Sequence, residues 1–216
     1  MHYYPVFLNL TNRRVLVIGG GKMAYEKVEG LLNAGACVSV IAPNINAQLR
    51  ELVEAKRITY ISREYQYGDL ESAFLVICAT ENRSEHAEVF AEANARNIVV
   101  NVVDDPAYCS FIAPSILRRG DLTIAISTSG KAPAVAVRLR QQLEEQIGDE
   151  YARFLEIAGT LRAPLAERCP DFETRKELWY RLVDSGVLEL LRAGNDAAAE
   201  ERIVEIMGIY PQIIGS

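Results

Sequence analysis

Histidine and tryptophan are scarce in this chain, which has two histidines and one tryptophan in 216 residues. The four cysteines include no CxxC pair, so the closely spaced ligands of a structural zinc site are missing. No run approaches the roughly 18 apolar residues of a membrane span, and MHYYPVFLNL has no basic leader. These absences predict a cytoplasmic protein with reduced thiols, no metal site and no membrane contact.

A net charge of −6 opposes nonspecific nucleic-acid binding, which depends on a basic surface. The composition is that of an ordinary globular protein, with 50% hydrophobic and 24% charged residues. We therefore expect a folded protein with no nucleic-acid partner, in which a local basic patch holds any anionic ligand.

Short β-branched runs alternate with helical patterns through the first half of the chain. RVLVIG, CVSVIA, RITYI, AFLVICAT and NIVVNVV are typical of strands, and a helix is expected near 84–95. This alternation predicts an α/β fold with a doubly wound parallel sheet of the Rossmann type, over residues 1–113.

The pattern changes after Val103. A loop leads to the strand DLTIAIS and to a helix that begins near Pro133, which predicts a small α+β module at 114–148. Only helical patterns follow, with Asp171 and Asp196 as expected N-caps, which predicts an all-helical domain at 149–216.

The segment VLVIGGGKMAYEKVEGLLNAG places a glycine-rich turn between a strand and a helix. Gly19, Gly21 and Ala24 match G-x-G-x-x-A, in which the glycines form the turn and admit a pyrophosphate, while alanine allows close packing. The backbone N–H groups of Lys22 and Met23 would face the phosphates. A tight turn without a ligand is the alternative, but the βαβ context favours a dinucleotide site.

The second strand ends in VIAPN, without the Asp or Glu that usually binds the adenosine ribose. NAD and NADP are therefore both open at this position. Pro43 and Asn44 are candidates to lie beside the ribose, although a Pro-Asn turn is equally ordinary. Thr80, in CATEN, is a further candidate for cofactor contact, with turn formation as its alternative.

Two carboxylates leave the fifth expected strand in NVVDDPAYCSFIAPS. Asp104 and Asp105 are candidates for a base or a metal ligand, but they also suit a turn before Pro106. The residues alone slightly favour the turn. Cys109 lies beside them, without a Cys–His pair that would activate it.

STSGKAPA, at 127–134, places hydroxyl groups, a glycine and a lysine before a helix, an arrangement that can bind an anion. Between residues 118 and 140, five basic residues stand against the single acid Asp121. A bound polycarboxylate and a solvated helix face explain this excess equally well. The basic residues are Arg118, Arg119, Lys131, Arg138 and Arg140.

Two long segments carry a resemblance to a known family: YYPVFLNLTNRRVLVIGGGKMAYEKVEGLLNAGA and NVVDDPAYCSFIAPSILRRGDLTIAISTSGKAPAVAVRLRQQLE. With the helical tail, they resemble the precorrin-2 dehydrogenase/sirohydrochlorin ferrochelatase family of siroheme synthesis over essentially the whole chain. The resemblance implies an NAD-binding Rossmann domain, a small dimerisation module, a helical C-terminal domain and a homodimer. Such enzymes oxidise the tetrapyrrole precorrin-2 with NAD, and some then insert ferrous iron as a co-substrate.

The resemblance also implies site residues. Asp104 would be catalytic, accepting protons during oxidation and from pyrrole nitrogens during metal insertion. No histidine is expected near it, which leaves few nitrogen ligands for iron. The residues expected to contact the substrate are Asp105, Ser110, Thr128, Ser129, Gly130, Lys131 and Arg138.

Two other functions fit the nucleotide-binding signature. One is an NAD(H)-sensing regulatory module without tetrapyrrole chemistry, in which the helical tail transmits cofactor occupancy to a partner. The other is an NAD(P)-dependent oxidoreductase of a smaller substrate. The basic residues between 118 and 140 favour a larger anion over the second of these.

Overall fold

The computed structural model describes residues 3–209. The chain divides into two compact units, Met1–Ala113 and Pro114–Ser216. The elements of the first unit are β1 (Arg14–Ile18), α1 (Lys22–Asn33), β2 (Cys37–Ile41), α2 (Ala47–Glu54), β3 (Thr59–Ile61), β4 (Leu75–Cys78), α3 (Arg83–Ala95), β5 (Val99–Val102) and the short 3₁₀ helix η1 (Pro106–Tyr108).

The first unit contains a five-stranded sheet in the order β3-β2-β1-β4-β5. Every pair of neighbouring strands is parallel. The chain moves outward from β1 to β3, then returns to the other side of β1 and continues outward through β4 to β5. This arrangement confirms the predicted doubly wound fold and places its topological switch point between β1 and β4, where such folds bind ligands.

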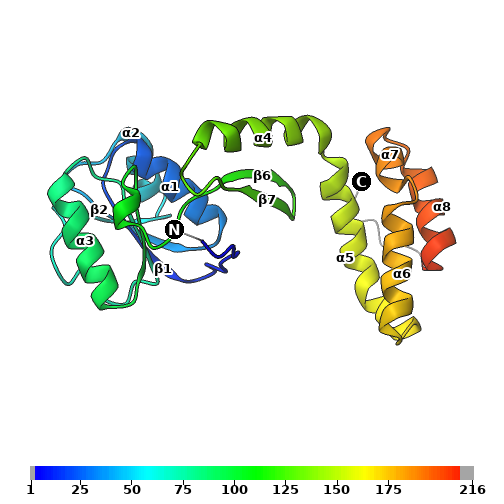
Figure 1. Cartoon of the computed structure of the whole chain (residues 1–216). Coiled ribbons are helices and arrows are strands. Elements are labelled where there is room, and N and C mark those ends of the chain that lie inside the picture. The colour runs from blue at the N-terminus through cyan, green and yellow to red at the C-terminus, as the bar shows by residue number, and fades with distance from the viewer. Residues whose placement is uncertain (1–2, 210–216) are drawn as a thin grey trace. The chain divides into compact units, whose positions relative to one another are not determined.

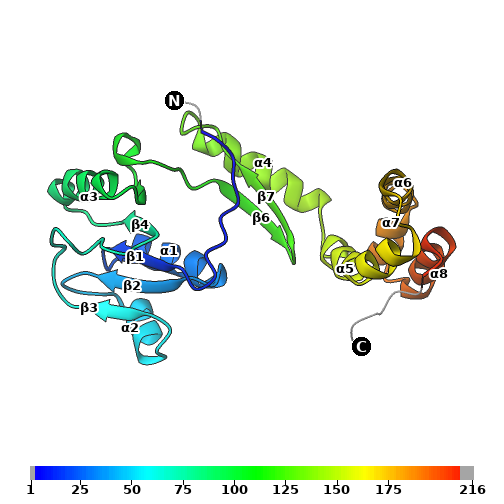
Figure 2. The same ribbon diagram turned by 90° about the horizontal axis from the view of Figure 1, so that it is seen from below.

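Alternate residues of β1 belong to two separate cores. Val15 and Val17 are fully buried with residues of α1 and α2, whereas Leu16 and Ile18 are buried with residues of α3. Successive side chains of a strand point to opposite faces, so the apolar run RVLVI supplies both cores at once. The sheet is therefore covered by helices on both faces (Figures 1 and 2).

Glu92, on α3, is fully buried and ties the segment after β3 to that helix. Its carboxylate accepts hydrogen bonds from the Tyr65 hydroxyl at 2.5 Å, the Gly68 amide at 2.8 Å and Arg96 Nε at 2.7 Å. Burial, and then the bond to Glu92, raise the pKa of Tyr65 far above its ordinary range, so the hydroxyl keeps its hydrogen.

The second unit begins with β6 (Ser115–Arg119) and β7 (Leu122–Ile126), an antiparallel hairpin that packs beside α4 (Pro133–Gln146), as Figures 1 and 2 show. The sequence predicted β7 and α4 but missed β6. The strand ends in two arginines, and Leu117 is its only buried residue, so it lacks the apolar pattern by which the other strands were recognised.

Four helices complete the second unit: α5 (Glu150–Arg168), α6 (Phe172–Val183), α7 (Val187–Arg192) and α8 (Asp196–Met207). They enclose a core that includes Leu161, Leu182 and Ile203. Asp171 caps α6 as predicted, by accepting from the Thr174 amide at 2.8 Å. None of the helices within residues 3–209 combines the length and the apolar character needed to cross a bilayer.

The predicted cap of α8 is wrong by one residue. The Asn195 side-chain oxygen accepts a hydrogen bond from the Ala198 amide at 3.3 Å, so Asn195 is the N-cap. Asp196 is the first residue of the helix, and its carboxylate pairs with Arg153. An amide oxygen serves as well as a carboxylate at an N-cap, which makes the adjacent Asn and Asp hard to distinguish from the sequence.

We predict that Glu92→Ala lowers the free energy of unfolding by about 3 kcal/mol, because it leaves buried donors without an acceptor. Glu88→Ala, at an exposed position of the same helix, should change it by less than about 0.5 kcal/mol. Urea unfolding followed by circular dichroism measures both. Equal losses in the two variants would contradict a special role for the buried carboxylate.

Candidate functional site

Four loops meet at the carboxyl edge of the parallel sheet, one after each of β1, β2, β4 and β5. Backbone hydrogen bonds extend the strand pairing into these loops. The Gly19 amide donates to Ile41 O at 2.9 Å, the Ala79 amide to Ile18 O at 2.7 Å, and the Val103 amide to Cys78 O at 2.8 Å. The four loops are therefore fixed relative to one another before any ligand binds.

The three consecutive glycines of the first loop have different roles. Gly19 has a φ of +120°, and a Cβ there would lie 2.5 Å from Ala79 O. A Cβ on Gly20 would lie 1.9 Å from Asn44 O, whereas a Cβ on Gly21 would meet nothing within 4 Å among residues 3–209. The first two glycines are thus required by neighbouring backbone, and the third leaves open space. The sequence prediction omitted Gly20, although the run of three glycines was its signal.

The N-terminus of α1 lies directly after this open position. Gly21 is the N-cap and provides no side chain to cap the helix, so the first N–H groups have no partner within the helix. Lys22 and Met23 are exposed, and Ala24 is fully buried against the sheet. These residues fit a pyrophosphate, because the helix dipole favours an anion at an uncapped N-terminus.

The loop after β2 packs on the glycine turn. The Asn46 amide donates to Gly20 O at 2.9 Å. The carbonyl of Pro43 accepts from the hydroxyls of Tyr60 at 3.2 Å and Ser62 at 3.3 Å. The side chains of Pro43 and Asn44 are both exposed, so the structure places these two predicted cofactor residues beside the turn.

Thr80 lies in the loop after β4, next to Gly19. Its hydroxyl accepts from the Asn82 amide at 3.2 Å, and its carbonyl lies 3.1 Å from His86 Nε2. Thr80 therefore shapes its own turn, as the alternative interpretation of the sequence held. The same residue adjoins the glycine turn, where it remains a candidate for contact with a cofactor.

Asp104 and Asp105 form a turn after β5, and their side chains differ in environment. The Asp105 amide donates to Val102 O at 3.2 Å, and Asp104 adopts the left-handed region with a φ of 61°. The Asp105 carboxylate lies 3.4 Å from His86 Nδ1. Asp104 is exposed, and its carboxylate has no hydrogen bond or ion pair within residues 3–209.

The expectation that no histidine lies near this site is wrong. His86 is 6% exposed and points from α3 toward Asp105. The two residues are 19 positions apart, and the fold joins them because α3 leads from β4 into β5. A sequence scan for neighbouring histidines could not find this pair.

Cys109 and Ser110 support the backbone of β5. The Cys109 thiol donates to Val102 O at 3.1 Å, and burial raises its pKa, so it is unsuited to act as a thiolate. The Ser110 hydroxyl accepts from the Val100 amide at 2.8 Å and can donate to the Val100 carbonyl at 3.2 Å. The hydroxyl predicted to contact the substrate is thus occupied in holding the chain beside β5.

The other predicted substrate residues belong to the second unit. In the turn before α4, the Thr128 hydroxyl accepts from the Ala132 amide at 3.2 Å, and the Ser129 amide donates to the Ser127 hydroxyl at 3.0 Å. Ser129, Gly130 and Lys131 are exposed. The turn is thus shaped by its own hydroxyl groups and presents Lys131 to solvent.

The basic residues between positions 118 and 140 differ in whether they have partners. Arg119 donates to Ile147 O at 3.0 Å, and Arg140 pairs with Glu144, so these two have structural partners. Arg118 and Lys131 are exposed and form no ion pair in the portion of the chain that the structure covers. Only part of the basic excess in the sequence is therefore free to meet an anion.

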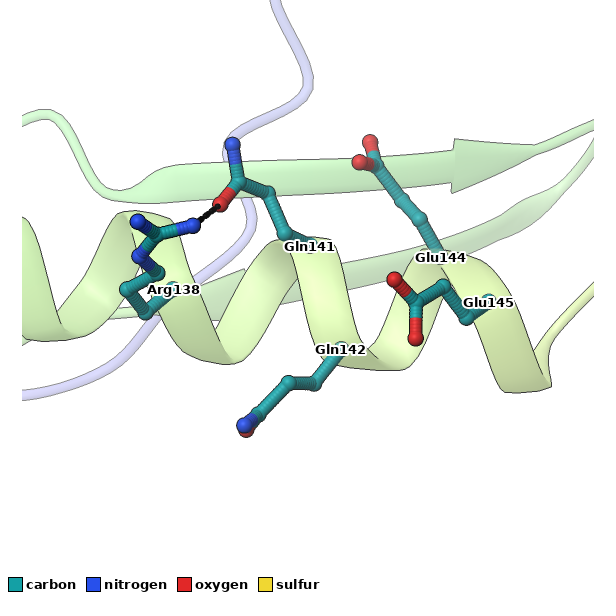
Figure 3. Close-up of a pocket in the computed structure, with 5 residues that line it drawn as sticks. All are labelled: Arg138, Gln141, Gln142, Glu144 and Glu145. Atoms are coloured by element: carbon teal, nitrogen blue, oxygen red, sulfur yellow. Dashed lines mark hydrogen bonds between the residues drawn. The ribbon is translucent and has the colours of Figure 1, made fainter.

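Arg138 lines a hollow on the surface of α4 (Figure 3). Its guanidinium donates to Gln141 Oε1 at 3.0 Å. The other lining residues are Gln142, Glu144 and Glu145, all from the same helix. Because one helix supplies every wall and two walls are acidic, this hollow does not form an anion site by itself. Within the described residues, no three His, Cys, Asp or Glu side chains gather to hold a metal.

Models of three protein families match the chain in sequence order. The model described as "Putative NAD(P)-binding" matches residues 6–115, which is more than half of the chain. The model of the sirohaem biosynthesis protein central region matches 119–146, and that of the sirohaem synthase dimerisation region matches 150–207. The first match covers the sheet and its glycine turn, and the third covers α5 to α8.

Similar proteins of known name agree with these models. The chain is 37% identical over 206 residues to a siroheme synthase of Photobacterium profundum and 40% identical over 205 residues to one of Pseudomonas paraeruginosa. Each alignment covers 95% of this chain and 44% of the relative, so the chain spans less than half the length of these relatives.

Among solved structures, SirC, a precorrin-2 dehydrogenase, superposes with a TM-score of 0.75 and 25% sequence identity. The match covers 96% of this chain and 100% of that one. The three matched regions follow one another along the chain with only a few residues between them. They and the structural match over 96% of this chain agree with the motifs found in the sequence. The chain therefore belongs to the precorrin-2 dehydrogenase/sirohydrochlorin ferrochelatase family, and a part of the siroheme synthases is similar to it.

Proposed function

We propose that this protein oxidises precorrin-2 to sirohydrochlorin, with NAD as the hydride acceptor. The observation that carries the proposal is the pairing, on one sheet edge, of an open glycine turn with an unengaged carboxylate. Gly21 and the uncapped start of α1 suit a pyrophosphate, and Asp104 is exposed two loops away. The precorrin-2 dehydrogenase that superposes on the chain supports the choice of substrate.

The proposed reaction removes two hydrogens from the tetrapyrrole. NAD would supply a hydride acceptor when bound, so that one hydrogen would leave the tetrapyrrole with both bonding electrons and yield NADH. The other leaves as a proton, and we assign its acceptance to the Asp104 carboxylate. The backbone of Lys22 and Met23 would hold the pyrophosphate, while Pro43, Asn44 and Thr80 would border the rest of the cofactor.

A tetrapyrrole that carries many carboxylates requires cations, and we assign Lys131 and Arg138 to this role. Both are exposed in the second unit. Thr128, Ser129 and Gly130 would contribute through the turn that positions Lys131. Ser110 and Asp105 would act on the substrate only indirectly, since the side chains of both are occupied by neighbouring residues.

We further propose that the chain acts as a homodimer. The sirohaem synthase dimerisation model matches 150–207. The second unit also exposes Val135 and Leu139, which lie one turn apart on the same face of α4, and a second copy would cover them. Ferrous iron would be a further substrate if Asp104 also accepts the protons that the pyrrole nitrogens release on metal insertion.

The function is tested by anaerobic incubation of the protein with precorrin-2 and NAD, following the visible spectrum and NADH formation. We expect sirohydrochlorin to appear only with NAD. Ferrous iron is then added, and faster siroheme formation would support the second activity. Tight NAD binding without any spectral change would replace this proposal with the NAD(H)-sensing regulatory module.

We predict that Gly21→Val weakens NAD binding at least about tenfold, a loss of about 1.4 kcal/mol, because its side chain occupies the space left for the pyrophosphate. The variant should remain folded, since a Cβ at Gly21 meets no neighbour within 4 Å. Gly30→Ala is the matched control: its Cβ is equally free, and it lies near the other end of α1. Isothermal titration with NAD measures both, and unchanged affinity in Gly21→Val would contradict the assigned cofactor site.

We predict that Asp104→Asn lowers kcat about 100-fold, the usual contribution of a positioned general base. Asparagine tolerates the left-handed backbone and nearly preserves the shape of the side chain, so NAD affinity and stability should not change. Asp121→Asn, at another exposed position, is the control. Full turnover by Asp104→Asn would show that another group accepts the proton.

A further inference from the structure

His86 is a buried side chain without a role in the reaction proposed above. It is 6% exposed, whereas Ala87 and Glu88 beside it on α3 are exposed. Both of its ring nitrogens lie near oxygen atoms: Nε2 is 3.1 Å from Thr80 O, and Nδ1 is 3.4 Å from Asp105 Oδ2. A carbonyl oxygen and a carboxylate oxygen can only accept a hydrogen bond, so the two contacts together require a hydrogen on both Nε2 and Nδ1.

The two oxygen partners belong to loops with different proposed tasks. Thr80 follows β4, and the carbonyl of the preceding Ala79 packs against Gly19 in the cofactor turn. Asp105 follows β5 and is the next residue after Asp104 in the sequence. His86 therefore connects the loop beside the cofactor turn with the loop of the proposed base.

The backbone around Asp104 depends on such restraints. Its φ of 61° lies in the left-handed region, which residues other than glycine adopt infrequently, so contacts made by the neighbouring residues help to hold it. Asp105 is held through its carbonyl, which accepts from the Tyr108 amide at 3.1 Å. His86 holds its side chain, so Asp105 is fixed at both backbone and carboxylate.

We infer that His86 is a positioning residue, which fixes the Asp104 carboxylate relative to the bound cofactor by linking Thr80 O to the carboxylate of Asp105. The inference rests on the proposed function, because the effect is exerted on the proton transfer assigned to Asp104. His86 itself contacts neither proposed ligand. Its removal should therefore affect turnover and leave cofactor binding intact.

The first test is His86→Gln, whose terminal amide extends to the place of Nε2 and can still donate to Thr80 O, while the contact to Asp105 is lost. We expect kcat to fall about tenfold, because small displacements of a catalytic group lower the rate steeply. The dissociation constant for NAD should not change. Glu88→Gln, exposed on the same helix, should match the wild type in both measurements.

The link between the two side chains is tested by a double-mutant cycle. Asp105→Ala should lower kcat as much as His86→Gln does, and the double variant should be no slower than either single variant. Asp105→Asn should lose less, because its amide keeps a polar partner for Nδ1. Losses that multiply in the double variant, or equal losses in Asp105→Asn and Asp105→Ala, would overturn the inference.

A spectroscopic measurement tests the same link without turnover. The chain has two histidines, so nitrogen-15 spectra of the imidazoles are assigned by comparison with His86→Gln. We expect hydrogen on both Nε2 and Nδ1 of His86, and a shift of the Nδ1 signal in Asp105→Ala. An unchanged Nδ1 signal would contradict the contact.

The outcomes separate this inference from the proposed function. A wild type that fails to oxidise precorrin-2 would refute the proposed function, and the positioning role with it. A wild type that is active, with His86→Gln equally active, would refute the inference alone.

Discussion

The close approach of backbone to backbone at the carboxyl edge of the sheet is the constraint on which the candidate site depends. Gly20 lies so near the carbonyl of Asn44, and Gly19 so near that of Ala79, that neither position has room for a side chain. Parallel strand pairing in one register brings these loops together. The glycine turn packs against the loops after β2 and β4 on one side, and its other side, at Gly21, is left open.

The sequence predicted most of the first unit because the apolar strands and the glycine turn are local signals. RVLVI alternates between two cores and is flanked by glycines and a helical pattern, so a window of a few residues suffices to recognise it. β6 was missed because two of its five residues are arginines and only one is buried. Its position depends on pairing with β7 and on packing under α4, and neither can be read from five residues.

The candidate site was predictable to the same extent. Gly19, Gly21 and Ala24 follow a pattern whose spacing is fixed by one turn, and the structure places them as that pattern requires. Residue type alone could not show which side chains are already occupied. Ser110 offers its hydroxyl to Val100, and Arg140 pairs with Glu144. These partners are chosen by tertiary structure, so a count of polar residues overstates the number free to meet a ligand.

The two adjacent aspartates show why such contacts decide function. They have the same chemistry and the same place after β5, and the sequence cannot rank them. Asp105 precedes Pro106, which disfavours helical backbone, and Asp105 has a φ of −133° and a ψ of 79°, outside the helical region. The reversal of the chain then falls on Asp104, which takes the left-handed conformation and is exposed. Asp105 turns toward His86. One proline and one buried imidazole thus distinguish the two carboxylates: Asp105 contacts His86, and Asp104 is the exposed one to which we assign the proton transfer.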